Sequence, residues 1–458
     1  MKFLFINTPP YMPVQVHLPP LGILYLARIL ENNGHQVSII DCSAEGINKR
    51  EIQKQVLSSD AVGLSVFSYF LEGAHKIVEI IKEKDPNVPL LMGGPHCTLA
   101  PHQAIREFPI DICAIGEAEL IIEPLVEVIG GKRRLSSIPG IYYKEKNKIK
   151  HTTSPKWVKN LDTIPFPAHH LVEKYDYRYS IRDKFLKGKR TSLITSRGCP
   201  SRCRFCEIPS MISEYRERSV DNVSKEIDEL VDKGYKKICI EDQNFLGNKK
   251  RAEKILDHII QNDYNIRMEI GGARVDSADE RLYQKMRDAG VELILYGIES
   301  GNQDVLDFYN KKITLSQVRK AVKLSKKMGF ITSGSFILGA HIETKKHIKN
   351  TIRFAKSLSL DIVAFNNLIY MCGSLLWKEA VEEGKIQPDE YTVPADSQRG
   401  LGNFTKEELV NYCRKALKGY YLDPRYIIKQ LIKAFKRKDF RFIKTDLNMS
   451  TARKIFKF

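Results

Sequence analysis

No part of this 458-residue sequence is an uninterrupted run of about 18 apolar residues, the length that a helix needs to cross a membrane. The first seven residues form only a short apolar run, without the long apolar region and the small-residue cleavage site of a signal peptide. Internal repeats and low-complexity tracts are absent as well. With 43% hydrophobic and 28% charged residues, the composition is that of a soluble globular protein. We therefore expect a cytoplasmic protein of two or three domains.

The nine cysteines are an odd number, which argues against a framework of disulfides in a long chain without an export signal. Six of them are scattered, several in apolar runs where a buried thiol is expected. The other three, Cys199, Cys203 and Cys206, stand together in one short segment. This segment is the candidate metal site of the sequence.

The formal net charge of +18 is concentrated near the C-terminus. Residues 405–458 contain 15 basic and 5 acidic residues, while the other 404 residues carry a net charge of only +8. A protein that binds nucleic acid more often shows its basic excess across the whole body. We therefore expect no nucleic-acid partner, and the C-terminal excess needs a local explanation.

The fold class is predicted to be α/β, with two series of alternating strands and helices. Residues 1–130 alternate in the manner of a doubly wound parallel sheet. Residues 131–190 are interrupted by prolines and are interpreted as a linker with a small hairpin near Tyr142. Residues 191–371 contain six strand–helix units and predict a partial (β/α)6 barrel, followed by a helical, basic region at 372–458. The predicted barrel strands are 192–195, 237–241, 267–271, 292–296, 333–338 and 361–365.

The three clustered cysteines have the spacing C-x3-C-x2-C directly after a predicted strand. Three thiolates on one loop can hold three irons of a [4Fe-4S] cluster, which leaves the fourth iron open to another ligand. The alternative is a zinc site completed by His169 or His170, although nothing in the spacing requires such a ligand. We favour the iron–sulfur interpretation.

This segment, with Phe205 directly before the third cysteine and a barrel behind it, resembles the radical S-adenosylmethionine (SAM) superfamily. The resemblance covers about residues 191–371. It implies that the open iron binds the amino and carboxylate groups of SAM, and that the reduced cluster cleaves SAM to a radical that removes hydrogen from unreactive carbons. It also implies SAM-proximal positions at Phe205, Glu241, Asp242, Arg274, Gly297, Glu299, Ser300 and Gly339. The alternative for each is structural, because charged pairs can tie loops together and glycines permit tight turns.

One departure from the family pattern follows the fifth barrel strand. The family often has Gly-x-Pro-x-Glu-Thr there, whereas this chain reads Gly339-Ala340-His341-Ile342-Glu343-Thr344. Because the proline is replaced, His341 becomes a candidate catalytic residue at the mouth of the barrel.

Residues 1–130 resemble the cobalamin-binding domain that precedes the barrel in one large radical SAM class. The resemblance is carried by Pro19-Pro20-Leu21-Gly22 before a helix and by Gly93-Gly94-Pro95-His96 after a strand. It implies cobalamin contacts at Gly22, Ser65, Ser68, Gly93 and Gly94. Pro19 stands where methionine-synthase-like domains have their cobalt-binding histidine, so that lower ligand is missing. His17 is interpreted as a solvated loop residue, and the alternative for the domain is a sheet that binds only protein.

Together, the two resemblances imply methylation of an unactivated carbon or phosphorus of an unknown substrate. The chain is also similar to the anaerobic magnesium-protoporphyrin monomethyl ester cyclase family, so radical chemistry without methylation, such as oxidative cyclisation or ring rearrangement, is an alternative. A more remote alternative is a non-catalytic cobalamin or cluster sensor. The family further implies a reducing partner such as flavodoxin or ferredoxin.

Apolar residues and lysines recur at helical spacing between Tyr426 and Arg437. A basic amphipathic helix of this kind can lie on an anionic membrane surface. This pattern suggests a peripheral membrane contact through residues 424–458 and a lipid as the alternative to a soluble small-molecule substrate. The interpretation that we favour is that the apolar stripe packs on the barrel and the lysines face solvent.

Overall fold

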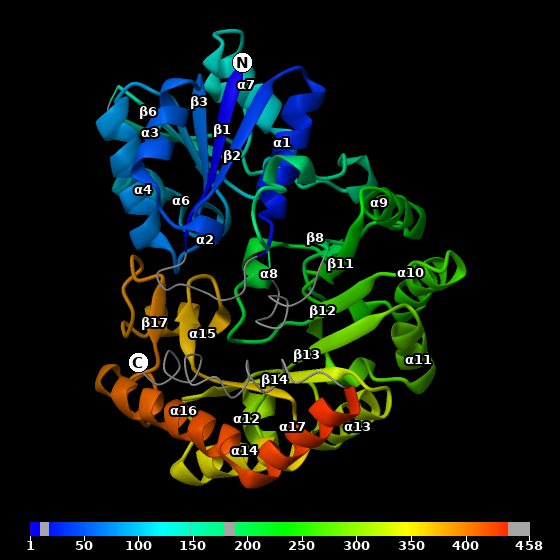
Figure 1. Ribbon diagram of the computed structural model, residues 1–458. Coiled ribbons are helices and arrows are strands. Elements are labelled where there is room, and N and C mark those ends of the chain that lie inside the picture. The colour runs from blue at the N-terminus through cyan, green and yellow to red at the C-terminus, as the bar shows by residue number, and fades with distance from the viewer. Residues whose placement is uncertain (10–17, 147, 178–187, 438–458) are drawn as a thin grey trace. The chain divides into compact units, whose positions relative to one another are not determined.

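The computed structural model describes residues 1–9, 18–146, 148–177 and 188–437 (Figure 1). The chain forms two compact units. Unit 1 contains Met1–Arg178 and Ser210–Ser219, and unit 2 contains Tyr179–Pro209 and Val220–Phe458. Most of the segment that we interpreted as a linker therefore packs within unit 1.

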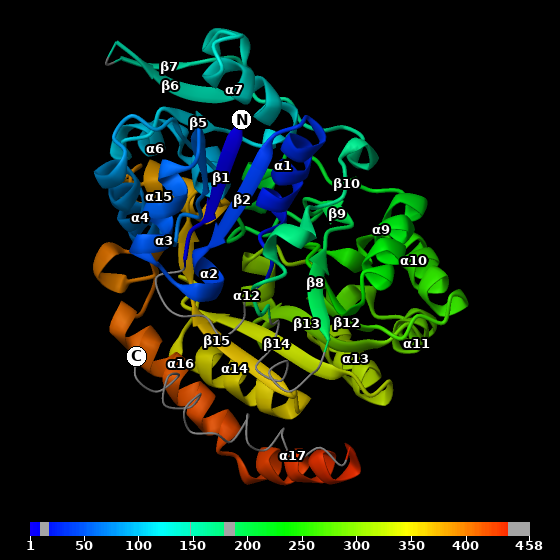
Figure 2. The same ribbon diagram turned by 45° about the horizontal axis from the view of Figure 1, so that its top comes forward.

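Unit 1 is built on a seven-stranded sheet in the order β2-β1-β3-β4-β5-β6-β7. The first five strands are parallel, as the prediction of a doubly wound sheet requires. The predicted hairpin near Tyr142 is confirmed, because β6 and β7 form an antiparallel ribbon that extends this sheet (Figure 2). The strands are β1 (Lys2–Asn7), β2 (Gln36–Asp41), β3 (Ala61–Ser65), β4 (Leu90–Gly93), β5 (Ile112–Ala114), β6 (Ile141–Glu145) and β7 (Lys148–His151), and the helices are α1 (Leu21–Asn32), α2 (Cys42–Glu45), α3 (Lys49–Leu57), α4 (Leu71–Lys84), α5 (Pro95–Leu99), α6 (Pro101–Glu107) and α7 (Ile122–Ile129).

Unit 2 is built on a parallel six-stranded sheet in the order β8-β11-β12-β13-β14-β15, with helices α9 to α14 between its strands. This arrangement confirms the predicted partial barrel. The strands are β8 (Lys189–Leu193), β11 (Tyr235–Ile240), β12 (Arg267–Ala273), β13 (Val291–Glu299), β14 (Ile331–Leu338) and β15 (Ile362–Asn367), and the helices are α9 (Val220–Asp232), α10 (Lys249–Gln261), α11 (Glu280–Asp288), α12 (Gln303–Phe308), α13 (Leu315–Lys327) and α14 (Lys345–Leu358).

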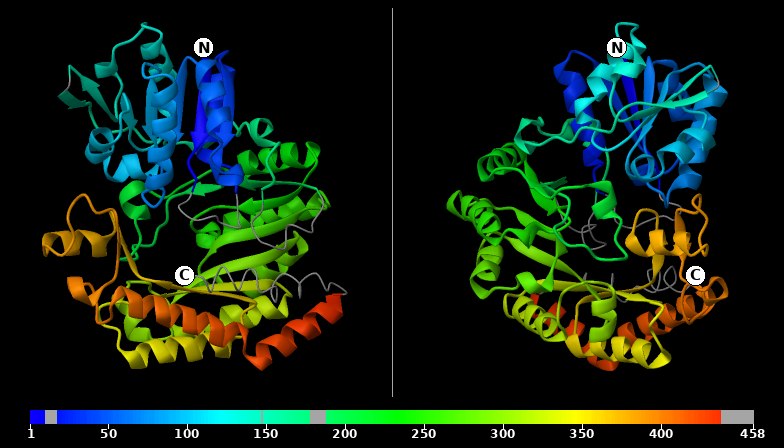
Figure 3. Two further views of the ribbon diagram at one scale, coloured as in Figure 1. Left: turned by 60° about the vertical axis from the view of Figure 1, so that its left-hand side comes forward. Right: turned by 180° about the vertical axis from the view of Figure 1, so that it is seen from behind.

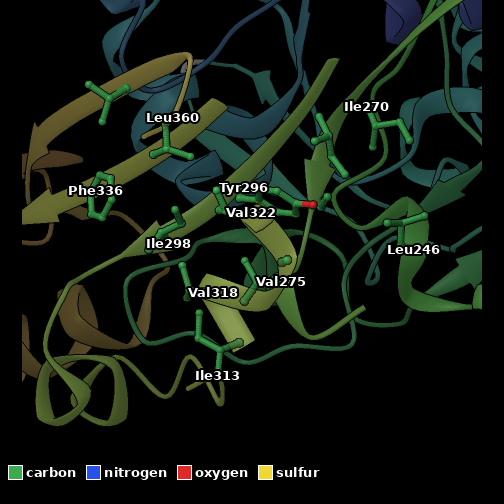
Figure 4. Close-up of a cluster of buried hydrophobic side chains, with 14 of the residues drawn as sticks. Leu246, Ile270, Val275, Tyr296, Ile298, Ile313, Val318, Val322, Phe336 and Leu360 are labelled. Carbon is green, nitrogen blue, oxygen red and sulfur yellow. The ribbon is translucent and has the colours of Figure 1, made fainter. Parts of the chain in front are cut away.

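The core of unit 2 lies between these strands and their helices. Tyr296 and Ile298 of β13 are fully buried in one cluster with Val318 and Val322 of α13 (Figure 4). Because successive side chains of a strand point to opposite faces, Gly297 lies on the inner face of the barrel. The alternation in β13 thus separates a packing face from a face that is available to ligands.

The region after Met371 is mainly helical in its described part. It contains α15 (Leu375–Glu382), α16 (Lys406–Tyr421) and α17 (Pro424–Arg437), together with a short ribbon of β16 (Ile369–Met371) and β17 (Thr392–Pro394). Thr405 and Glu408 form a capping box that begins α16, which packs along β15, and α17 follows it (Figure 3). Within the described ranges, the structure has no helix that is both long and apolar enough to cross a membrane.

Candidate active site

The carboxyl ends of the parallel strands of unit 2 meet at one edge, where a parallel sheet binds its ligands. The cysteine loop, residues 198–207, lies at this edge directly after β9 (Ser196–Arg197). Cys199, Cys203 and Cys206 are half-buried free cysteines. Gly198 starts the loop with a φ of +83°, a conformation that favours glycine. All three thiols therefore belong to one short loop.

Asp242 holds the start of the cysteine loop. It is buried, and its carboxylate accepts hydrogen bonds from the backbone N–H of Thr195 at 2.6 Å, the Thr195 hydroxyl at 2.5 Å and the Ser196 hydroxyl at 2.6 Å. Arg251 adds a bond to the Thr195 carbonyl oxygen at 2.6 Å. Both oxygens of Asp242 are therefore engaged by protein groups, which indicates that this residue positions the loop.

The segment 308–311, here called the strap, also holds the cysteine loop. Sequence reasoning did not identify this segment. The Tyr309 carbonyl accepts a hydrogen bond from the Arg204 backbone N–H at 3.0 Å, and the Asn310 side chain donates to the Arg202 carbonyl at 2.8 Å. The Arg204 side chain also binds Glu379 at 2.5 Å. No motif marks the strap in the sequence, because its contacts join residues that are about a hundred positions apart.

The strap carries Lys311, which forms a buried ion pair with Glu299 at 2.7 Å. Glu299 has a φ of +66°, and a Cβ on Gly297 would lie 2.5 Å from its Oε1, so Gly297 leaves room for this carboxylate. The Lys311 ammonium lies 5.9 Å from the centre of the Phe205 ring, and the Arg274 guanidinium donates to the Lys311 carbonyl at 2.8 Å. The structure therefore brings Phe205, Arg274, Gly297 and Glu299 together around a lysine that sequence reasoning did not identify.

Glu241 directly follows β11, and its backbone N–H donates to the carbonyl of Leu193, the last residue of β8, at 3.0 Å. Burial raises the pKa of Glu241 to about 7, and the Asp242 charge adds to this rise. A hydrogen bond with Ser192 acts in the opposite direction and lowers the pKa. Its Oε1 is buried and has no hydrogen-bond partner among the described residues. An acceptor of this kind is suited to a ligand that donates hydrogen bonds, such as an amino group.

The remaining predicted residues occupy the neighbouring strand ends. Ser300 is fully buried, and its hydroxyl lies 3.2 Å from that of Thr351. Gly339 has a φ of +113° and donates its backbone N–H to Glu343 at 2.6 Å. His341 is exposed and packs edge-on against Phe308 of the strap, with the ring centres 4.5 Å apart. Ser300 is thus placed in the interior, while Gly339 and His341 lie in the loop that follows β14.

The three cysteines fit an iron–sulfur cluster better than a single ion. Across the described part of the chain, no three His, Cys, Asp or Glu side chains converge on one ion, whereas a cluster binds each thiolate to a different iron. Burial raises the pKa of Cys206 to about 12, so without a cluster this thiol stays protonated. His170, one of the two histidines considered as a zinc ligand, bonds to Glu31 at 2.8 Å within unit 1.

Unit 1 has a carboxyl edge of its own, where Ser65 ends β3 and Gly93 ends β4. A Cβ on Gly93 would make only ordinary van der Waals contact with Ala114, at 3.8 Å, so no other element packs closely on this glycine. Gly94 has a φ of +96°, and a Cβ there would lie 2.9 Å from the Val66 backbone, so this glycine permits a close approach of two strand ends. The order β2-β1-β3 makes this edge a topological switch point, the usual ligand crevice of such sheets.

The other predicted residues of unit 1 divide between its surface and its interior. Gly22 is exposed in the first turn of α1, and a Cβ there would meet no atom within 4 Å. Ser68 is buried, with its hydroxyl 3.2 Å from His96 Nδ1, and burial lowers the pKa of His96 to about 4. Pro19 is buried, and His17 lies outside the described residues. A cluster of Phe67, Tyr69 and Phe70, which sequence reasoning missed, follows β3 at the same edge.

The sequence matches the radical SAM superfamily over residues 193–355 and the B12 binding domain over residues 13–126. A protein of Pyrococcus horikoshii named as an uncharacterized methyltransferase is 34% identical over 421 residues, which cover 90% of each chain. The anaerobic magnesium-protoporphyrin IX monomethyl ester cyclase of Rubrivivax gelatinosus is 27% identical over 379 residues, 79% of this chain and 67% of the relative.

Two solved structures share the fold. The radical SAM methyltransferase TsrM from Kitasatospora setae, with cobalamin and a [4Fe-4S] cluster bound, gives a TM-score of 0.70 at 18% identity and covers 83% of this chain and 78% of its own. The cobalamin-dependent SAM radical enzyme OxsB, with aqua-cobalamin and SAM bound, gives a TM-score of 0.75 at 19% identity and covers 99% of this chain and 71% of its own. At these identities the likeness concerns the fold.

Proposed function

Because the chain belongs to the radical SAM superfamily and carries a B12 binding domain before its barrel, we propose that it methylates an unactivated carbon or phosphorus atom of a small molecule. It is an enzyme whose cofactors are a [4Fe-4S] cluster, SAM and cobalamin. The observation that carries the proposal is the 34% identity, over 90% of both chains, with a relative named as a methyltransferase. When bound, the cluster and SAM supply a radical that can remove hydrogen from carbon, and cobalamin supplies a methyl group.

The residues of the chain have distinct parts in this proposal. Cys199, Cys203 and Cys206 hold the cluster, and Asp242 and the strap fix the loop that carries them. The unpartnered Oε1 of Glu241 accepts a hydrogen bond from the amino group of SAM. The pair of Lys311 and Glu299 excludes water and holds the adjoining Phe205 and Arg274 in place. In unit 1, the open edge at Gly93 receives part of the cobalamin.

The test is to reconstitute the protein under anaerobic conditions with iron, sulfide and hydroxocobalamin, and to incubate it with a low-potential reductant such as titanium(III) citrate, SAM carrying a deuterated methyl group and a set of small molecules. Methyl transfer predicts a labelled product together with both S-adenosylhomocysteine and 5′-deoxyadenosine. Iron without cobalt in the reconstituted protein, or 5′-deoxyadenosine without S-adenosylhomocysteine, contradicts it.

Radical chemistry without methylation, such as an oxidative cyclisation, is the second candidate. It is favoured by the 27% identity with the magnesium-protoporphyrin cyclase over 79% of this chain. In the experiment above, this chemistry gives 5′-deoxyadenosine and a product that carries no label. The two candidates are therefore separated by a single mass measurement.

We further propose two partners. One is a reductant of the flavodoxin or ferredoxin type, since the cluster has to be reduced before it acts on SAM. The other is a membrane surface, contacted through residues 424–458, whose basic composition supports such a contact and a lipid as the substrate. Residues 438–458 lie outside the described part of the chain, so the structure describes this region only through α17.

A further inference from the structure

Helix α17 places two of its charged side chains, those of Lys429 and Lys433, against unit 2. The Lys429 ammonium lies 3.4 Å from Asp361 Oδ1 and Lys433 binds the same carboxylate, which is only 1% exposed. Lys429 also bonds to the Ser359 carbonyl, and the Tyr426 hydroxyl donates to the Asp361 carbonyl at 2.9 Å. The interpretation that we favoured from the sequence, with lysines in solvent and the apolar stripe on the barrel, is therefore wrong.

The opposite side of α17 is apolar and exposed. Ile428 is 56% exposed and Ile432, one turn later, is 51% exposed, with Leu422 at 62% in the turn before the helix. The buried Asp361 explains this orientation, because a carboxylate in the interior requires cations and the two lysines reach it only from the inward side. A line of apolar side chains that is held outward in this way is typical of a binding surface.

A pocket rich in cations adjoins this surface at the start of α17. Its volume is about 190 Å³, and it is lined by Lys356, Ser357, Arg425 and Lys429, with Asp423 as its carboxylate. Lys356 and Arg425 pair with Asp423 there, and Lys429 pairs with the buried Asp361, so three cationic side chains face two carboxylates and one positive charge is in excess. Such a lining is suited to anionic oxygens, such as those of a phosphate group.

We propose that α17 lies on an anionic membrane, with Ile428 and Ile432 in the boundary of the acyl chains and the adjoining pocket on a lipid phosphate. The inference rests on the membrane contact proposed above and assigns it to one face. Basic charge favours a negative leaflet and opposes a second copy of the chain, because residues 405–458 contain 15 basic against 5 acidic residues. The apolar stripe and the pocket thus match the two parts of one lipid surface.

The test compares the full-length protein with the variant Ile428→Ser/Ile432→Ser in co-sedimentation with phosphatidylcholine vesicles, with and without phosphatidylglycerol. Both isoleucines are more than half exposed, so the variant should keep its melting temperature. The control is Leu57→Ser/Leu120→Ser, which removes apolar side chains that are 62% and 45% exposed in unit 1. We expect binding of the protein and of the control only to anionic vesicles, and at least about a tenfold loss for the α17 variant.

Each other outcome overturns part of the argument. If the protein binds anionic vesicles and the α17 variant binds equally well, the membrane contact stands and its assignment to this face is wrong. If the unaltered protein does not bind them, both the contact and the assignment fail. If light scattering shows a dimer that the α17 variant abolishes, a second copy covers the stripe and the membrane proposal is wrong. None of these measurements requires the cofactors, so they are independent of the methyl-transfer proposal.

Discussion

At the scale of single residues, Lys311 and Glu299 form an ion pair whose side chains are both more than nine-tenths buried. Lys311→Met leaves the Glu299 carboxylate buried without its cation, which is expected to lower the free energy of unfolding by about 3–5 kcal/mol. The double variant Glu299→Gln/Lys311→Met should recover most of this loss, because no charge is left behind. Urea denaturation of the three proteins measures these changes.

The neighbouring lysine provides the control for this prediction. Lys312 is the next residue in the chain and is exposed, so Lys312→Met is expected to change stability by less than about 0.5 kcal/mol. Equal losses of unfolding free energy for Lys311→Met and Lys312→Met would mean that the buried ion pair contributes no stability of its own.

Glu343 makes stability depend on pH. Burial raises the pKa of Glu343 to about 7, although the backbone N–H groups of Gly339 and Ala340 act in the opposite direction. The folded state then binds more protons than the unfolded state between about pH 4.5 and 7, so this group lowers stability as pH rises through that range, by about 3 kcal/mol in total. Glu343→Gln lacks this titration while keeping an acceptor for both N–H groups.

The measurement for Glu343 is the difference in unfolding free energy between Glu343→Gln and the unaltered protein across this range. We expect the difference to move in favour of the variant as pH rises from 5 to 8. A difference that stays constant with pH would contradict a raised pKa at this position.

At the scale of elements, the docking of α17 depends on one buried carboxylate. Burial alone would raise the pKa of Asp361, but Lys433 and Lys429 outweigh burial and hold its pKa below the usual value. Asp361→Asn leaves two lysines without their anion and is expected to cost about 3 kcal/mol. Faster hydrogen exchange of residues 424–437, with the exchange of β11 and β12 unchanged, would show that α17 has lost its docking.

The first turn of α17 offers a control, the loss of a surface ion pair between Arg425 and Asp423. Arg425 binds Asp423 at 2.9 Å, but its side chain is 82% exposed. Arg425→Met is therefore expected to cost less than about 1 kcal/mol. If Asp361→Asn has as small an effect, the lysines are not what orients the helix.

At the scale of the whole molecule, the two cofactor sites are predicted to be separable because they are assigned to different units. Cys203→Ala should lose iron and keep cobalt, whereas Gly93→Leu should lose cobalt and keep iron. A Cβ at Gly93 makes only ordinary van der Waals contact with Ala114, and an unchanged melting temperature of Gly93→Leu would show that the unit stays folded. Iron and cobalt per chain after anaerobic reconstitution give the result, with Cys413→Ala, at a buried cysteine of the core, as the control that keeps both metals.

Failure of this prediction has a clear meaning for each variant. Gly93→Leu with a full complement of cobalt would place cobalamin away from this edge of unit 1. Cys203→Ala with a full complement of iron would remove the cysteine loop as the site of the cluster.

The sequence by itself determined the parts of this protein that depend on neighbours in the chain. The spacing of Cys199, Cys203 and Cys206, the six barrel strands, the doubly wound sheet and the hairpin at Tyr142 are all local patterns of period and motif. Such patterns can be recognised without knowledge of the fold, because each is contained in a short stretch of consecutive residues. The resemblance to known families rests on the same local signals.

Only the tertiary structure decided how distant residues are used. Asp242 accepts hydrogen bonds from Thr195 and Ser196, Lys311 pairs with Glu299, and Lys429 and Lys433 of α17 turn inward to Asp361. The helical period of α17 shows that an apolar face exists, but it contains no information about which face meets the barrel. The orientation of α17 is set by the free-energy cost of burying the Asp361 carboxylate without its cations. Its partner Lys433 is about 70 residues away in the sequence.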